Sequence, residues 1–200
     1  GYGLSETAPA ASIDPIDGKT FSDTIGLPLP STEMSIQDDK GKILSAEKEG
    51  EICIRGPQVM RGYWNNEKDT KNVLTKDGWF KTGDIGKMRK DGYFQIVDRK
   101  KDMIIVSGFN VYPSDIEEVA MQHQKILEAG CIGVSGKNGQ ELVKLFVSVV
   151  DGETITKDEI LEHCRNNLTA YKVPKLLEIV DEIPKSNVGK ILRRELREIK

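Results

Sequence analysis

The chain has 200 residues, of which 38% are apolar and 30% are charged, and its formal net charge is −3. This weakly acidic balance argues against a dedicated nucleic-acid binder, which needs an excess of Lys and Arg. No apolar run approaches the length of about 18 residues that a membrane-spanning helix needs, and the first ten residues lack the basic and apolar regions of a signal peptide.

The first half of the chain is rich in short β-like runs separated by Gly and Pro. Alternation in EICIR (51–55) and the aromatic and β-branched runs at 79–80 and 93–97 predict strands. Two similar segments, KDGWF (76–80) and KDGYF (90–94), place Asp-Gly before an aromatic pair, as tight turns that lead into strands do. We therefore expect adjacent hairpins in a barrel-like or sandwich-like β unit.

In the second half, helices and strands alternate, so the sequence predicts an α+β fold. Capping boxes at SDIE (114–117), behind Pro113, and at TKDE (156–159) each predict the start of a helix, the first of which ends near Gln122. Strands are predicted at 127–134, 142–150 and 176–180, with Asn138-Gly139 as the turn between the first two, and a final helix is predicted at 191–199. The boundary between the halves falls on DRKKD (98–102).

The three cysteines and two histidines lack the spacing of a metal site. Cys53 alternates with isoleucines and Cys164 falls on the apolar stripe of an expected helix. With Cys131, they are expected to be buried reduced thiols, as in a cytosolic protein. His123 and His163 lie among polar residues, which places them at the surface.

Two segments carry more polar residues and glycines in fixed arrangements than packing needs. In YGLSETAP, Tyr2 offers a ring face and Gly3 a close approach of the backbone. Ser5 adds a hydroxyl and Glu6 a carboxylate, although an exposed turn explains this segment equally well. In FKTGD, Asp84 follows a glycine at a strand end, where one carboxylate can accept hydrogen bonds from two ribose hydroxyls. An acidic residue in a tight turn is the alternative there.

Two further segments carry basic groups. Arg99 offers a planar fork of donors for ribose or phosphate oxygens, and Gly108 permits the close approach of a ligand or another chain segment. A charged hairpin arm is the alternative for both. In PKSNVGKILRR, Lys190 follows Gly189 on an expected turn, from which its ammonium group could reach a phosphate. An ordinary basic helix start is the alternative for this segment.

Together, the order and spacing of these segments resemble the adenylate-forming acyl-CoA synthetase family (AMP-binding enzymes), and within it the bacterial long-chain fatty-acid–CoA ligases. The segments that carry the resemblance are YGLSETAP (2–9), GEICIRGPQVMRGYW (50–64), GWFKTGDIG (78–86), GYFQIVDRKKDMIIVSGFNVYPSDIE (92–117), YKVPK (171–175) and PKSNVGKILRREL (184–196). Enzymes of this family activate a carboxylic acid with ATP, release pyrophosphate, and pass the acyl group from the acyl-adenylate to coenzyme A.

The resemblance implies which residues bind the nucleotide. Tyr2 would lie against the adenine, with Gly3 beside it. Ser5 would contact phosphate; the family often has Thr at this position, and the hydroxyl is retained. Asp84 would bind the two ribose hydroxyls, and Arg99 would also contact the ribose.

The remaining roles implied by the resemblance concern the metal and the chemistry. Glu6 would help to hold Mg²⁺, a hard cation that favours carboxylate oxygen. Lys190 would be catalytic, because its charge would offset the charge that builds as the carboxylate attacks the α-phosphate. Lys101 would be the hinge, whose backbone twist exchanges Lys190 for the loop at Gly108 and Phe109, which would line the path of coenzyme A.

The resemblance also implies a domain organisation. Residues 1–98 would be the β-rich, barrel-like end of a large N-terminal domain, residues 99–102 the hinge, and residues 103–200 a small α+β C-terminal domain with a mixed sheet and flanking helices. The family's Ser/Thr/Gly-rich phosphate loop, which ends in Pro-Lys-Gly, does not occur in the sequence. We therefore expect a C-terminal fragment that is inactive alone.

The implied substrates are a fatty acid, ATP and coenzyme A, with Mg²⁺ and without nucleic acid, in the cytoplasm. An apolar substrate is also compatible with peripheral association at the inner face of the membrane. Two other interpretations stay open. One is a different adenylate-forming enzyme, such as a peptide-synthetase adenylation domain, another acyl- or aryl-CoA ligase, or an oxidising luciferase. The other is a non-catalytic interaction module that uses the basic end KILRREL, although Glu195 and Glu198 favour a solvated face of mixed charge.

Overall fold

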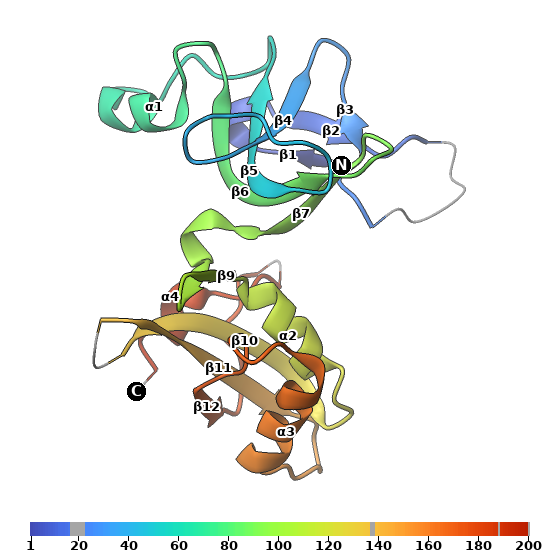
Figure 1. Cartoon of the computed structure of the whole chain (residues 1–200), viewed down its shortest axis with the longest axis vertical. Coiled ribbons are helices and arrows are strands. Elements are labelled where there is room, and N and C mark those ends of the chain that lie inside the picture. Colours follow the sequence, from blue (N-terminus) through green and yellow to red (C-terminus); the bar gives the residue numbers. More distant parts are fainter. Residues whose placement is uncertain (17–22, 137–138, 188, 200) are drawn as a thin grey trace. The chain divides into compact units, whose positions relative to one another are not determined.

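Figure 1 shows a computed structural model of the chain, which describes residues 1–16, 23–136, 139–187 and 189–199. The chain divides into two compact units, Gly1–Lys101 and Asp102–Lys200. The division falls within residues 99–102, and the domain assignment itself stays a prediction. Strands and helices in both units confirm the predicted α+β class. In the described part of the chain, no helix has the length and apolarity to cross a bilayer.

The first unit is built from two antiparallel sheets. Strands β1 (Tyr2–Gly3), β2 (Ala10–Ile13) and β3 (Leu27–Pro28) form one of them, and β4 (Glu33–Gln37), β5 (Glu49–Arg55), β6 (Phe80–Met88) and β7 (Phe94–Arg99) form the other in that order. Helix α1 (Glu67–Val73) lies between β5 and β6 along the chain. The two sheets share one apolar cluster, in which Ala11 of β2 meets Ile52 and Ile54 of β5.

The two Asp-Gly turns form as predicted, but only one of them closes a hairpin between long strands. Gly78 and Gly92 adopt positive φ angles of 87° and 88°, which glycine tolerates without strain. The turn at Gly92 joins β6 to β7, which pair in an antiparallel manner. The turn at Gly78 closes a single bridge between Leu74 and Phe80, because α1 occupies the chain before it.

The second unit is a mixed three-stranded sheet covered on both faces. Strand β10 (Ile126–Ser135) is antiparallel to β11 (Glu141–Val149), which is parallel to β12 (Leu176–Ile179). Helices α2 (Pro113–Met121) and α3 (Lys157–Asn167) pack on one face through one buried cluster. The short helix α4 (Arg193–Leu196) packs on the other face through a second cluster. A hairpin of β8 (Ile104–Val106) and β9 (Phe109–Val111) precedes α2.

Of the two capping boxes predicted in the second unit, one forms and the other does not. The box at Thr156 is confirmed, because its hydroxyl accepts from the Glu159 amide at 3.2 Å and the Glu159 carboxylate accepts from the Thr156 amide at 2.7 Å. The box at 114–117 is wrong, since α2 begins with Pro113 behind Tyr112 and has no side-chain cap. Glu117 is instead buried, and its carboxylate accepts from the backbone of β10.

The final helix is much shorter than the predicted 191–199. Only Arg193–Leu196 is helical, because Ile191 forms a β-bridge with Lys185 and the chain is therefore extended at this point. The predicted strands at 127–134, 142–150 and 176–180 are confirmed as β10, β11 and β12. Of the predicted turn at 138–139, position 138 lies outside the described residues, and Gly139 has a φ of 72°.

The three thiols are buried and free, as predicted. Burial raises the pKa of Cys53 to about 12 and that of Cys164 to about 11, so both thiols stay protonated near neutral pH. The surface placement of the histidines is wrong in part, because both rings are half-buried. His123 and His163 pack edge to face with ring centroids 5.2 Å apart, since α3 lies against the end of α2.

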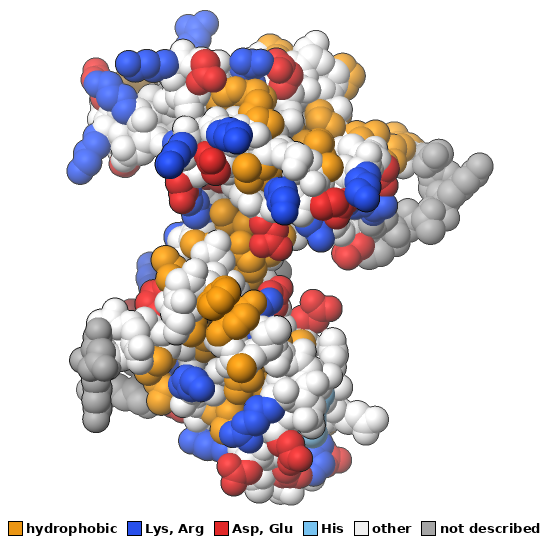
Figure 2. Space-filling view, in the orientation of Figure 1, with side chains coloured by type: hydrophobic (Ala, Val, Ile, Leu, Met, Phe, Trp, Pro, Cys, Tyr) orange, Lys and Arg blue, Asp and Glu red, His pale blue; other side chains and the backbone are white. Residues whose placement is uncertain are grey.

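Charged side chains of both signs are interspersed over the visible face of each unit (Figure 2). This distribution is what the net charge of −3 predicts for a chain with 29 basic and 32 acidic residues. Several exposed charges are paired locally, among them Arg55 with Glu33 at 2.6 Å and Arg89 with Asp91 at 2.6 Å. Such exposed pairs contribute little to stability, because water and salt screen the charges.

Candidate functional site

The carboxylate of Asp84 is bound from two sides in the first unit. The Tyr2 hydroxyl donates to its Oδ2 atom at 2.6 Å, and Arg99 Nε lies 2.8 Å from its Oδ1 atom. The register of β6 and β7 pairs Asp84 directly with Arg99, while β1 supplies Tyr2. The Asp84 side chain is 6% exposed. Burial, with the hydrogen bond to Asp84, raises the pKa of Tyr2 well above its usual value, so the tyrosine remains a donor.

A second carboxylate fixes the turn that precedes Asp84. Glu51 of β5 accepts the Gly83 amide at 3.0 Å through one oxygen and the Lys100 ammonium at 2.9 Å through the other. Lys100 also pairs with Asp39 at 2.8 Å. Partial burial lowers the pKa of Lys100, but these two carboxylates outweigh that effect and raise it overall. Gly83 has a φ of 73°, and an added Cβ there would meet nothing within 4 Å.

The N-terminal motif presents a second acidic group. Ser5–Thr7 form one short 3-10 turn. Within it, the Glu6 carboxylate accepts the Tyr63 hydroxyl at 2.8 Å, and the Glu6 carbonyl accepts the Met60 amide at 2.8 Å. Gly3 is needed for the path of the chain, because an added Cβ would lie 1.9 Å from the Pro9 carbonyl oxygen. The close approach expected at Gly3 is thus made by the chain itself.

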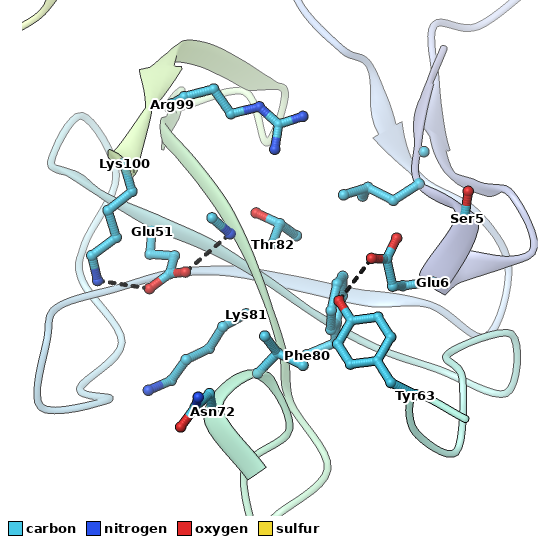
Figure 3. Close-up of a pocket in the computed structure, with 14 residues that line it drawn as sticks. Ser5, Glu6, Glu51, Tyr63, Asn72, Phe80, Lys81, Thr82, Arg99 and Lys100 are labelled. Carbon is cyan, nitrogen blue, oxygen red and sulfur yellow. Dashed lines mark hydrogen bonds and ion pairs between the residues drawn. The ribbon is translucent and has the colours of Figure 1, made fainter. Parts of the chain in front are cut away.

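A cavity of about 700 Å³ lies between the N-terminal motif and the turn in β6 (Figure 3). Two acidic and three basic side chains line it, together with hydroxyl, amide and apolar groups. Its lining residues are Gly3, Leu4, Ser5, Glu6, Glu51, Tyr63, Asn72, Val73, Phe80, Lys81, Thr82, Gly83, Arg99 and Lys100. Such a mixture suits a small polar ligand that carries phosphate and hydroxyl groups.

The structure therefore brings most of the predicted nucleotide-binding residues into one region of the first unit. Ser5, Glu6 and Arg99 line the cavity, and Arg99 contacts the Tyr2–Asp84 pair described above. Lys101 is exposed within a 3-10 segment, Lys100–Asp102, and is the last residue of the first unit.

The other predicted residues belong to the second unit, where Lys190 is exposed on a turn. The Lys190 carbonyl accepts the Ser186 amide at 2.8 Å, and the Lys190 amide donates to the Ser186 hydroxyl at 3.2 Å. Gly189 precedes Lys190 with a φ of 78°. The ammonium group thus extends from a turn whose backbone is closed by hydrogen bonds.

Gly108 and Phe109 lie at the tip of the β8–β9 hairpin. Ser107 and Gly108 both have positive φ angles, 52° and 85°, as a two-residue type I′ turn requires. Phe109 is 55% exposed, and its ring stacks on Tyr171 with centroids 4.6 Å apart. The hairpin therefore presents an exposed aromatic edge with a fixed orientation.

Sequence reasoning missed several groups that shape the cavity, chiefly Glu51, Tyr63, Lys81 and Lys100. Lys81 was the easiest of them to find, since it stands inside the motif FKTGD. Glu51 and Lys100 also stand inside matched segments, but their importance depends on pairing between distant strands. Tyr63 lies 57 residues from the Glu6 carboxylate to which it donates.

Comparisons with known proteins agree over nearly the whole chain. Residues 1–64 match the AMP-binding enzyme family and residues 115–190 match the AMP-binding enzyme C-terminal domain. The long-chain-fatty-acid–CoA ligase of Yersinia pestis is 56% identical over 198 residues, which are 99% of this chain and 35% of that protein. The ligase of the same name from Bacillus subtilis is 45% identical over 199 residues, again 99% of this chain and 35% of that protein.

Among solved structures, ATP-bound MatB from Rhodopseudomonas palustris matches with a TM-score of 0.92 and 35% identity. The match covers 98% of this chain and 39% of that chain. This chain therefore spans about a third of the length of the curated relatives that it matches.

Proposed function

The chain belongs to the adenylate-forming AMP-binding enzymes, and on that premise we propose that it is the C-terminal part of a long-chain fatty-acid–CoA ligase. A carboxylate oxygen of the fatty acid attacks the α-phosphorus of ATP, and the bond to pyrophosphate breaks. The sulfur of coenzyme A then attacks the acyl carbon, and AMP leaves. The identity with two fatty-acid–CoA ligases across 99% of the chain supports this substrate class.

The observation that carries the proposal is the Asp84 carboxylate, which is held by Tyr2 and by Arg99. Of these three residues, Arg99 lines the polar cavity. A carboxylate has about four lone-pair positions, and these two donors take one on each oxygen. The remaining positions can accept the two hydroxyls of a ribose. Arg99 lies at the same point, and its other guanidinium nitrogens can donate to the ribose oxygens. Tyr2 would then lie beside the adenine.

Glu6 and Ser5 fit a site for Mg²⁺ bound to the nucleotide. Glu6 lines the cavity, and Tyr63 engages one of its carboxylate oxygens. Mg²⁺ prefers oxygen ligands and commonly takes one or two carboxylates together with substrate phosphates and water. When bound, the ion would neutralise phosphate charge as pyrophosphate leaves. Glu6 would supply one oxygen, and Ser5 would hold phosphate through its hydroxyl.

Lys190, Lys101 and the β8–β9 hairpin complete the proposed machinery. Lys190 would place a positive charge between the acyl carboxylate and the α-phosphate, and its exposed turn leaves the ammonium free to reach them. Residues 1–98 and 103–200 would be parts of two domains joined at a hinge around Lys101. Gly108 and Phe109 would line the path of coenzyme A, with the exposed Phe109 ring available to its pantetheine arm.

One basic residue of the segment invoked by the interaction-module alternative is already paired within its own unit. Arg193, within the basic end KILRREL, is 17% exposed and is paired with acidic groups of its own unit. It therefore offers little charge to nucleic acid or anionic lipid.

The substrate preference of the full-length protein tests the other alternative, a different adenylate-forming enzyme. The full-length protein should release pyrophosphate faster with palmitate than with benzoate or amino acids, and a preference for an amino acid would contradict the proposal.

Replacing Asp84 with asparagine in the full-length protein should weaken ATP binding by about 10- to 100-fold, because hydrogen bonds to a charged acceptor contribute about 1.5–3 kcal/mol. Isothermal titration with ATP would measure the loss. Asp91→Asn is the matched control, since Asp91 lies in an exposed turn and pairs with Arg89. Unchanged ATP affinity in the Asp84→Asn variant would rule out the ribose role.

The isolated 200 residues should neither adenylate a fatty acid nor form its thioester. The chain spans about a third of its relatives, and the phosphate loop of the family does not occur in it. A pyrophosphate-release assay with ATP, palmitate and coenzyme A would test this expectation. Sustained turnover by the isolated chain would show that these residues are sufficient for catalysis.

The cytoplasmic location of the protein stays a prediction.

A further inference from the structure

Arg193 connects two acidic groups in the interior of the second unit. Its Nη2 atom lies 2.8 Å and 3.0 Å from the two carboxylate oxygens of Glu117. Its Nη1 atom lies 3.8 Å from Asp102. The three side chains are only 17%, 8% and 10% exposed, and Glu117 also accepts the Cys131 amide at 2.8 Å. The guanidinium is therefore bound to α2 and to the first residue of the unit, and Glu117 links it to β10.

A second arginine of the same segment reaches the same aspartate. Arg197 Nη2 lies 3.5 Å from Asp102 Oδ1, whereas Arg193 faces the other carboxylate oxygen, Oδ2. Asp102 thus stands between the first residue of α4 and the residue that follows this helix. Since Asp102 directly follows Lys101, the chain just beyond the proposed hinge is bound to the C-terminal segment of its own unit.

The turn that carries Lys190 has little freedom relative to Arg193. Only two residues separate them, and both are held: Ile191 pairs with Lys185 across the turn, and the Leu192 amide donates to the Pro184 carbonyl at 2.8 Å. The position of Arg193 therefore determines where the turn ends at Lys190.

Apolar packing already anchors this segment to the sheet. Leu196 is fully buried, and it lies so close to β10 that a Cβ added at Gly130 would be 2.7 Å from it. Buried ion pairs are weak sources of stability, because the desolvation of both charges opposes their attraction. An arginine fork does, however, give directional contacts. These pairs are thus better suited to fix an orientation than to add stability.

We propose that Arg193 is a positioning residue for Lys190, which holds the lysine turn at a fixed place relative to Asp102 and so to the hinge. The inference rests on the proposed function, since it requires Lys190 to act in adenylation. In this arrangement, a rotation at Lys101 would move Asp102 and the Lys190 turn together as one rigid group.

The test is a double-mutant cycle between Arg193→Lys and Lys190→Ala in the full-length protein. Arg193→Lys keeps the charge but loses the fork. It should lower kcat for palmitate-dependent pyrophosphate release by about tenfold and leave KM for ATP unchanged. Conversion of supplied palmitoyl-adenylate to palmitoyl-CoA should change by less than about twofold. In the Lys190→Ala background, Arg193→Lys should have no further effect on adenylation, because coupled residues are non-additive.

A merely structural role gives a different result and would overturn the proposal. Both half-reactions would then fall together with the thermal midpoint, and the Arg193→Lys factor would persist in the Lys190→Ala background. Arg194→Lys is the matched control, since Arg194 is the exposed neighbour. If Arg193 variants do not fold, the Asp102→Asn variant tests the proposal instead. It weakens the ion pair between Arg193 and Asp102 and leaves the Arg193–Glu117 pair intact. Asp102→Asn should show the same non-additivity with Lys190→Ala, and additive effects would overturn the proposal.

The same experiment separates this inference from the proposed function. If Lys190→Ala alone leaves pyrophosphate release intact, the role of Lys190 is wrong and the positioning role of Arg193 falls with it. If Lys190→Ala slows adenylation as expected while Arg193→Lys and Asp102→Asn leave it at the wild-type rate, the proposed function stands and only the positioning role is overturned.

Discussion

Replacing Lys190 with alanine in the full-length protein should slow adenylation by about 10²- to 10³-fold, while thioester formation from a supplied acyl-adenylate keeps its rate. The loss reflects one preorganised charge removed from the point where negative charge develops, which typically costs about 3–4 kcal/mol in the transition state. Single-turnover release of pyrophosphate reports the first half-reaction. Consumption of coenzyme A with palmitoyl-adenylate reports the second.

Because Lys190 is exposed, a loss of activity in the Lys190→Ala variant can be separated from a loss of folding. The side chain extends from a turn that is closed by backbone hydrogen bonds, so its truncation should leave the fold intact. Lys157→Ala is a suitable control, because Lys157 is also exposed and begins α3 in the same unit. Equal losses in both half-reactions would contradict the assignment of Lys190 to adenylation.

Replacing Lys101 with proline should reduce multiple-turnover synthesis of acyl-CoA by at least about tenfold, because a hinge must absorb a change of backbone angles and proline fixes φ near −65°. Lys101 is exposed, so the substitution empties no core position, and its cost to stability comes from the backbone alone. The thermal midpoint should therefore fall by only a few degrees, a smaller effect than the loss of turnover.

Lys101→Ala separates the backbone effect from the charge effect, since it removes the ammonium and leaves φ free. It should retain most of the wild-type turnover. The rate of the first adenylation event should also survive in Lys101→Pro if that variant rests in the adenylating orientation. Equal turnover in the proline and alanine variants would show that the angles of Lys101 do not change during the cycle.

Sequence patterns predicted the elements whose conformation depends on near neighbours. The apolar runs at 127–134 and 142–150 correspond to β10 and β11 within one residue at each end, because alternation along the strand and burial in the sheet agree there. The Thr156 box is confirmed for the same reason, since both of its partners lie within one helical turn.

The predictions that were wrong depended on partners far along the chain. Glu117 looked like half of a capping box, but Arg193, 76 residues away, binds its carboxylate. Ile191 looked helical, but its bridge to Lys185 extends the chain. At the candidate site, Tyr2 and Asp84 are 82 residues apart. Their identity could be read from motifs, whereas their hydrogen bond depends on the register of sheets that no local pattern encodes.

Ion pairs stand on both sides of Lys101. Before it, Lys100 is bound to Glu51 of its own unit, whose carboxylate is 10% exposed. After it, Asp102 is bound to Arg193 and Arg197 of the other. If Lys101 is the hinge, as proposed, these pairs would leave its two backbone torsion angles as the main freedom of the chain at this point. The proposed change between the two working orientations would then be concentrated in the backbone angles of one residue.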